Sequence, residues 1–179
     1  MTNTKWIRGL FGGIAVLVIA ALVLAALNSC SSTQAGTAPG GPASPANPTK
    51  PIDPTTVTAQ VNGDTVSISL TQVTSKFNTR FALDTPQGQT SYMAYVWNGS
   101  VYVRADICPP CGSRSFKLTK GTLVCNACGT VFDALSGKGK SGACVRYTKE
   151  SVKYQVSGDS IVMTSNDLTA AYKNTLTPD

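Results

Sequence analysis

The interpretation of this sequence rests on two short stretches, ICPPCG at residues 107–112 and VCNACG at residues 124–129. In a C-x2-C-G turn both thiols point to one side, and the closing glycine adopts a positive φ at little cost. Two such turns that face each other place four thiolates around one centre. That arrangement suits a single Zn²⁺ or Fe ion, or a [2Fe–2S] cluster. The predicted metal ligands are Cys108, Cys111, Cys125 and Cys128.

The segment between the two turns predicts a strand hairpin. Phe116–Leu118 and Thr122–Val124 flank Lys120-Gly121, a turn signal. The two cysteine turns would therefore sit on neighbouring strand ends. A fifth cysteine, Cys144, follows a glycine- and lysine-rich loop at residues 137–142 that could lie over the site. We expect Cys144 near the metal, as a further candidate ligand.

Composition narrows the chemistry. None of the 179 residues is histidine, which excludes a Ser-His-Asp hydrolase, a Cys-His protease, and His-ligated zinc or haem. Without Lys5 and Arg8, which belong to the N-terminal segment, the net charge of +6 falls to +4 (13 − 9), which is too mild to indicate nucleic acid. No carboxylate pair or small-molecule site stands out, so the sequence favours a metal-binding protein or electron carrier over an enzyme.

Charge around the cysteines fits a metal site. Between Arg104 and Lys153 there are nine basic and three acidic residues, a net charge of +6 (9 − 3). Four thiolates around a divalent ion leave a charge of about −2, which a basic surround offsets. We expect Trp97, Arg104 and the 137–142 loop to modulate the centre.

The N-terminal segment, residues 1–29, predicts a signal peptide or membrane anchor. Gly9–Leu27 is uncharged and mostly apolar, and as a helix it would be roughly as long as the bilayer core is thick. Lys5 and Arg8 would stay cytoplasmic, so the rest of the chain would be exported. Leu27-Asn-Ser-Cys30 resembles a lipobox, which makes Cys30 the candidate lipidation site. A lipoprotein, an uncleaved anchor and a secreted protein all place the body outside the cytoplasmic membrane.

Residues 30–56 predict a tether. Six prolines lie from Pro39 to Pro54, among Ser, Thr, Ala and Gly. Such a segment buries too little apolar surface to order itself, and it reads as a semi-stiff spacer.

Residues 57–179 predict one small, mainly β, antiparallel domain, preceded by the N-terminal hydrophobic helix. Asn98-Gly99 is its strongest hairpin signal, and a short C-terminal helix is expected over Asp167–Lys173, capped by Ser165 or Asn166. The hairpin's first strand would present Tyr92, Ala94 and Val96 on one face and Met93, Tyr95 and Trp97 on the other. The predicted strands are Val57–Val61, Thr65–Leu70, Phe77–Leu83, Thr90–Trp97, Ser100–Asp106, Val152–Val156 and Ser160–Thr164.

These motifs resemble the FtrD-like family of membrane iron–sulfur proteins, over about residues 57–176. The features that carry the resemblance are DICPPCG (106–112), VCNACGTVF (124–132), GAC (142–144) and the closing strand IVM (161–163). The resemblance implies cluster binding at the two C-x2-C pairs, in an extracytoplasmic module of bacterial iron uptake. Its partners would be the membrane and a redox or metal-transport protein. CNACGTVFDALSG (125–137) is also similar to the second Rieske motif, with Cys in place of His, which implies a Rieske-like β fold.

Two other functions fit the same cysteines. A purely structural zinc site could stabilise a small binding module, because thiolates take Zn²⁺ or Cu(I) readily. A thiol–disulfide oxidoreductase could use either C-x2-C pair as its redox couple. A thioredoxin-type motif, however, opens a helix within a βαβ unit, whereas both pairs here have β flanks.

Overall fold

The computed structural model describes residues 47–179. The predicted N-terminal helix, the candidate lipidation site Cys30 and residues 30–46 of the tether lie outside the described residues. Within residues 47–179, neither helix combines the length and the apolar character that crossing a membrane requires.

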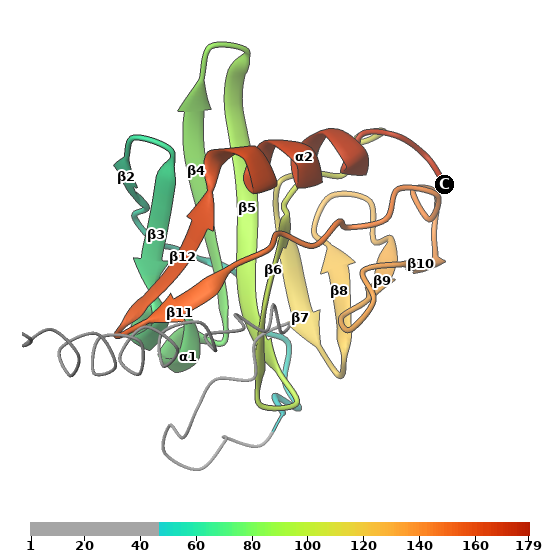
Figure 1. Ribbon diagram of the computed structural model, residues 1–179. Coiled ribbons are helices and arrows are strands. Elements are labelled where there is room, and N and C mark those ends of the chain that lie inside the picture. Colours follow the sequence, from blue (N-terminus) through green and yellow to red (C-terminus); the bar gives the residue numbers. More distant parts are fainter. Residues whose placement is uncertain (1–46) are drawn as a thin grey trace, which may run out of the picture. The chain divides into compact units, whose positions relative to one another are not determined.

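A central sheet runs through the domain (Figure 1). Strands β4 (Asn78–Thr85), β5 (Gly88–Trp97) and β6 (Ser100–Ala105) form an antiparallel meander, and β1 (Thr55–Thr56) pairs with β4 in parallel. The turn between β5 and β6 is Asn98-Gly99, with φ of 48° and 73°. Positive φ at both positions is what a tight hairpin requires, so the predicted hairpin is confirmed.

A second sheet has the order β11-β12-β3-β2. It consists of β2 (Gln60–Asn62), β3 (Thr65–Ser69), β11 (Gln155–Ser157) and β12 (Ser160–Thr164). Strand β12 pairs antiparallel with β3, so the end of the chain returns to the start of the domain. The C-terminal helix α2 (Ser165–Thr175) follows β12 directly.

The third sheet carries the cysteine turns and has the order β10-β9-β8-β7. Its strands are β7 (Phe116–Thr119), β8 (Thr122–Cys125), β9 (Val131–Asp133) and β10 (Gly139–Ser141). The pairing of β7 with β8 confirms the hairpin predicted between the two C-x2-C turns.

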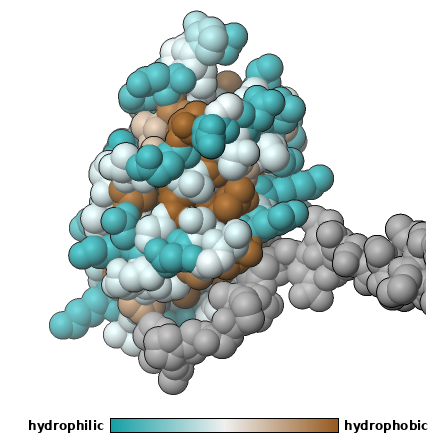
Figure 2. Space-filling model, turned by 60° about the vertical axis from the view of Figure 1, so that its left-hand side comes forward, coloured by the Kyte–Doolittle hydropathy of each residue, from teal (hydrophilic) through white to brown (hydrophobic). Residues whose placement is uncertain are grey.

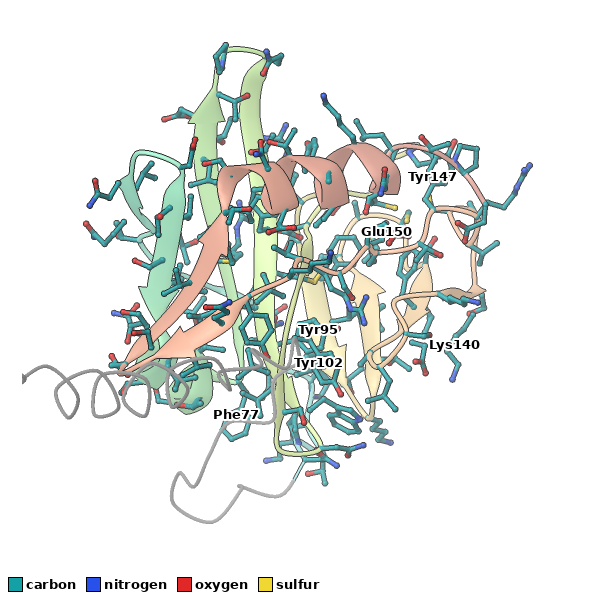
Figure 3. The ribbon with its side chains drawn as sticks, in the orientation of Figure 1. Phe77, Tyr95, Tyr102, Lys140, Tyr147 and Glu150 are labelled. Atoms are coloured by element: carbon teal, nitrogen blue, oxygen red, sulfur yellow. The ribbon has the colours of Figure 1, made fainter. Side chains whose placement is uncertain are left out.

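The alternating side chains of β5 divide the interior into two apolar clusters. Tyr92, Ala94 and Val96 pack in the first cluster with residues of β3, β12 and α2. Met93 and Tyr95 pack in the second cluster with the cysteine-bearing sheet, where Tyr95 stacks on Tyr102 (Figure 3). The predicted division of β5 into two faces is therefore confirmed, and its second face forms the floor beneath the cysteines.

Two details of the helices differ from the prediction. The body holds two helices rather than one, because α1 (Leu70–Lys76) follows β3. The Ser69 hydroxyl accepts the Gln72 N–H, and the Asp159 carboxylate accepts the Thr71 N–H, so tertiary contacts start this short helix. Helix α2 is capped by Thr164, not by Ser165 or Asn166, since Thr164 Oγ1 accepts the Asp167 N–H at 3.1 Å.

The end of the predicted tether contacts the domain. Ile52 and Leu118 exchange two backbone hydrogen bonds of 2.9 Å, and the Asn47 side chain hydrogen-bonds Asn98. On the face in Figure 2, hydrophilic side chains surround smaller apolar areas. The large apolar residues exposed among residues 47–179 are scattered singly: Val61, Leu135 and Leu176.

Gly137 makes a close approach that only glycine permits. We expect Gly137→Ala to destabilise the protein by about 2–4 kcal/mol, because the position combines positive φ with close packing. Its φ is +77°, and an added Cβ would lie 2.2 Å from the Lys149 carbonyl oxygen and 2.6 Å from Arg104 Nη1. Denaturant unfolding measures the loss. The control is Gly158→Ala, also at positive φ but with nothing within 4 Å. Equal losses in the two variants would contradict the packing argument.

Candidate metal centre

The first cysteine turn follows β6 through Asp106 and Ile107. Its backbone folds back on Cys108: the Cys108 N–H donates to the Ser113 carbonyl and the Gly112 N–H donates to the Cys108 carbonyl, each at 2.8 Å. Gly112 has φ of 69°, as expected for the residue that closes the turn. The turn leaves Cys108 buried and Cys111 exposed.

The second turn repeats this geometry at the end of β8. The Cys125 N–H donates to the Thr130 carbonyl and the Gly129 N–H to the Cys125 carbonyl, both at 2.9 Å, and Gly129 has φ of 68°. Cys125 is buried and Cys128 is exposed. The two turns are therefore local copies of one structure, presented from neighbouring strands.

Hydrogen bonds tie the two turns together and bring in the fifth cysteine. Asn126 donates to Ser115 twice, from its backbone N–H at 3.0 Å and from its side-chain amide at 2.7 Å. The Cys144 N–H donates to Thr130 Oγ1 at 3.2 Å. A Cβ on Gly142 would lie 2.7 Å from Thr130 Cα, so this glycine lets the Cys144 segment approach the second turn.

All five thiols of the described domain converge. Cys111 Sγ lies 3.7 Å from Cys125 Sγ, and Cys128 Sγ lies 3.9 Å from Cys108 Sγ and 3.8 Å from Cys144 Sγ. One subset is compact, with every sulfur within 4.8 Å of the others: Cys108, Cys111, Cys128 and Cys144. The structure thus brings together all the predicted ligands, and Cys144 joins them. The compact set contains Cys144 where the prediction had Cys125.

These spacings fit a metal ion. Four sulfurs about 2.3 Å from a tetrahedral ion lie about 3.8 Å from one another. Within the compact set, the contacts of Cys128 Sγ with Cys108 Sγ and Cys144 Sγ, at 3.9 and 3.8 Å, match this value, and the remaining pairs lie within 4.8 Å. They also exceed the ~2.05 Å length of a disulfide bond. The donor set is wholly sulfur, which suits zinc, iron or Cu(I).

The protein stabilises one exposed thiolate with hydrogen bonds. Partial burial opposes ionisation of Cys128, but the hydroxyl and backbone N–H of Thr130 together with neighbouring thiols lower its pKa to about 6. The Thr130 hydroxyl lies 3.2 Å from Cys128 Sγ. Burial, with the adjacent Cys144 and Cys111 thiols, raises the pKa of Cys108 well above its usual range. In the metal-free site, Cys128 at the exposed edge would therefore lose its proton before the buried Cys108.

The residues expected to modulate the centre contact segments that support it. Trp97 packs against Gly121 in the hairpin that joins the two turns. Arg104 is buried and hydrogen-bonds Tyr95, Leu135, Lys149 and Ser151. In the 137–142 loop, Gly142 packs on Thr130.

Sequence reasoning missed two residues of the site. Thr130 carried a usable signal, because it directly follows the second C-x2-C-G turn. Lys149 carried none, since it is one of nine basic residues in its region; the structure buries it completely beside the cysteines.

The domain is mainly β, and thiols from three of its segments lie close together. Together these features are those of a thiolate metal-binding protein. Comparison with family models matches residues 73–174 to the family described as "Membrane iron-sulfur containing protein FtrD-like". The match spans more than half of the chain, and the chain belongs to this FtrD-like family. No curated protein and no solved structure matches it. Family and cysteine cluster together support metal binding in a membrane context.

Removing the Thr130 hydroxyl tests the support of the site. In the metal-free protein, Thr130→Val should cost about 1–2 kcal/mol of stability, because the Cys144 N–H loses its acceptor. A hydroxyl that donates to a thiolate favours the ionised form, so its loss should raise the pKa of Cys128 from about 6 and slow alkylation at neutral pH. Denaturant unfolding and the pH profile of Cys128 alkylation measure both effects. Thr74→Val, in the exposed helix α1, is the control. An unchanged alkylation profile would refute the role of the hydroxyl.

Proposed function

We propose that this chain is a membrane-tethered, extracytoplasmic metal–thiolate protein that binds one metal centre and carries electrons, or handles metal, at the membrane. The observation that carries the proposal is the convergence of sulfurs from two turns and a loop, four of them within 4.8 Å of one another. Membership of the FtrD-like family supports iron as the metal.

The spacing of the sulfurs favours a single ion over a two-iron cluster. In a [2Fe–2S] cluster the four ligands divide between two irons, which separates one ligand pair from the other. Here Cys108, Cys111, Cys128 and Cys144 are all close neighbours, as around one tetrahedral ion. The best candidate is therefore one iron or zinc ion. A [2Fe–2S] cluster bound by the two C-x2-C pairs is the alternative.

A bound iron would supply one-electron redox chemistry, and all-sulfur ligation would keep its potential low compared with His-ligated Rieske centres. The chain's own residues hold and shield the ligands. Thr130 and the backbone N–H of Ser113 hydrogen-bond the exposed Cys128 and Cys111 thiols. Beneath the site, buried Phe116 and Phe132 meet edge to face, with ring centroids 5.8 Å apart, and exclude water from the interior side.

The N-terminal sequence supplies the proposed location. Gly9–Leu27 would anchor the chain, or direct lipidation at Cys30, and Lys5 and Arg8 orient it with its body outside the membrane. The tether would hold the metal domain within reach of a membrane redox or metal-transport partner. Neither a nucleic-acid partner nor a small-molecule substrate is part of this proposal.

A structural zinc site is the second candidate. The observation that favours it is the hairpin β7–β8 between two identical cysteine turns, a construction that also suits zinc-ribbon domains. Zinc has no redox chemistry, so in this case the metal would only stabilise a small binding module.

Metal analysis of the full chain, expressed and purified in detergent without oxygen, separates these functions. We expect about one iron per chain and a visible absorption that bleaches on reduction. Iron with equimolar sulfide would instead establish an iron–sulfur cluster. A colourless protein with one zinc would contradict electron transfer, and a metal-free protein with a reducible C-x2-C bond would contradict the metal centre itself.

Serine substitutions identify the fourth ligand. The compact set predicts that Cys144→Ser lowers metal content as strongly as Cys128→Ser does, whereas Cys125→Ser keeps most of it. Metal content and competition with a chelator measure the difference. The reverse ranking of Cys125→Ser and Cys144→Ser would assign the two C-x2-C pairs as the ligand set. Full occupancy in all three variants would refute a thiolate centre at this site.

A further inference from the structure

Lys149 is a fully buried cation next to the cysteines. Its exposed fraction is 0%, and its Nζ donates to the Ile107 carbonyl at 2.7 Å. The same Nζ lies 4.3 Å from the ring centroid of Phe132 and 5.4 Å from that of Phe116. One carbonyl and two aromatic faces solvate an ammonium group far less well than water does. A lysine is therefore rarely buried in this way unless an anion accompanies it.

No carboxylate is paired with Lys149. Within residues 47–179, the two ion pairs join Lys117 to Asp53 and Lys140 to Asp133. Asp106 is also buried; one of its carboxylate oxygens accepts a hydrogen bond from Ser91, the other has no hydrogen-bond partner, and no ion pair joins it to Lys149. Among the described residues, no carboxylate therefore lies within ion-pair distance of the Lys149 ammonium.

Thiolates held by a metal would supply the missing negative charge. Desolvation lowers the pKa of Lys149, and the charges of Cys108, Cys125 and Cys144 oppose that shift. Geometry agrees, because the ammonium is anchored to the carbonyl of Ile107, the residue that directly precedes Cys108. Thiolates that bind a divalent ion through four sulfurs leave a net charge of about −2, and an ammonium group buried beside them stabilises that charge.

We infer that Lys149 is the internal counter-ion of the metal–thiolate centre: a positioning residue, not a ligand, whose charge favours the ionised, metal-bound form. The inference rests on the proposed function and adds to it a residue that determines how strongly the site holds its metal. Its electrostatic role gives the metal-free and metal-bound proteins opposite responses when the charge is removed. Without metal the buried ammonium is a burden, whereas with metal it is half of an ion pair.

The test uses the full chain in detergent with Lys149→Met, which removes the charge, and Lys149→Gln, which keeps an N–H donor for the Ile107 carbonyl. Lys76→Met, at an exposed lysine of helix α1, is the matched control. Affinity for Zn²⁺ is measured by competition with a chelator, and thermal unfolding is followed with and without Zn²⁺. We expect both Lys149 variants to bind Zn²⁺ about tenfold more weakly or worse, while their metal-free forms unfold at the same or a higher temperature.

Each failure has its own signature. If the unaltered chain takes up no Zn²⁺ or iron, the metal centre is wrong and the inference falls with it. If the unaltered chain binds Zn²⁺ and both variants bind it equally well, the metal centre stands and the counter-ion is wrong. If both variants lose stability equally with and without Zn²⁺, Lys149 is only part of the packing, which also overturns the inference.

Discussion

The architecture of the site depends on one buried guanidinium. Arg104 lies in β6, one residue before the strand ends at Ala105, and Asp106 and Ile107 then lead to the first cysteine turn. It donates to Tyr95 Oη at 2.8 Å, to the Lys149 carbonyl at 2.7 Å, to Ser151 Oγ at 2.8 Å and to the Leu135 carbonyl. Because the planar guanidinium stays charged and offers five donors in fixed directions, it can hold several segments at once. These contacts join β6, the strand that leads to Cys108, to two other segments: the one that carries Lys149 and the one that follows β9.

Local signals were enough to predict most of the strands. The alternation along β5 and the Asn-Gly turn after it determine which side chains face which cluster, since both are set by the period of the strand and the sign of φ. Helix α1 was not predictable in this way. It is only seven residues long, and its first turn depends on Asp159, which is 88 residues away from Thr71 in the sequence.

The same distinction applies to the site. The C-x2-C-G spacing specifies the two turns because their hydrogen bonds are local, within a few residues of Cys108 and Cys125. The approach of Cys144 depends instead on a hydrogen bond to Thr130, and thus on how the 137–142 loop packs. Charge counting predicted a basic surround but could not tell its members apart. Only the tertiary structure shows that Arg104 and Lys149 are buried.

The two sides of the sulfur cluster are stabilised by different physical means. At the surface, water screens charges, so short-range hydrogen bonds from Thr130 and Ser113 are the more effective support for Cys128 and Cys111. In the interior, screening is weak, so the charge of the buried Lys149 would act on the thiolates of a metal centre without much attenuation. A docking partner would remove water from the exposed side alone and strengthen the hydrogen bonds there. In the counter-ion role proposed for Lys149, its charge would support metal binding in the free protein and in the complex alike.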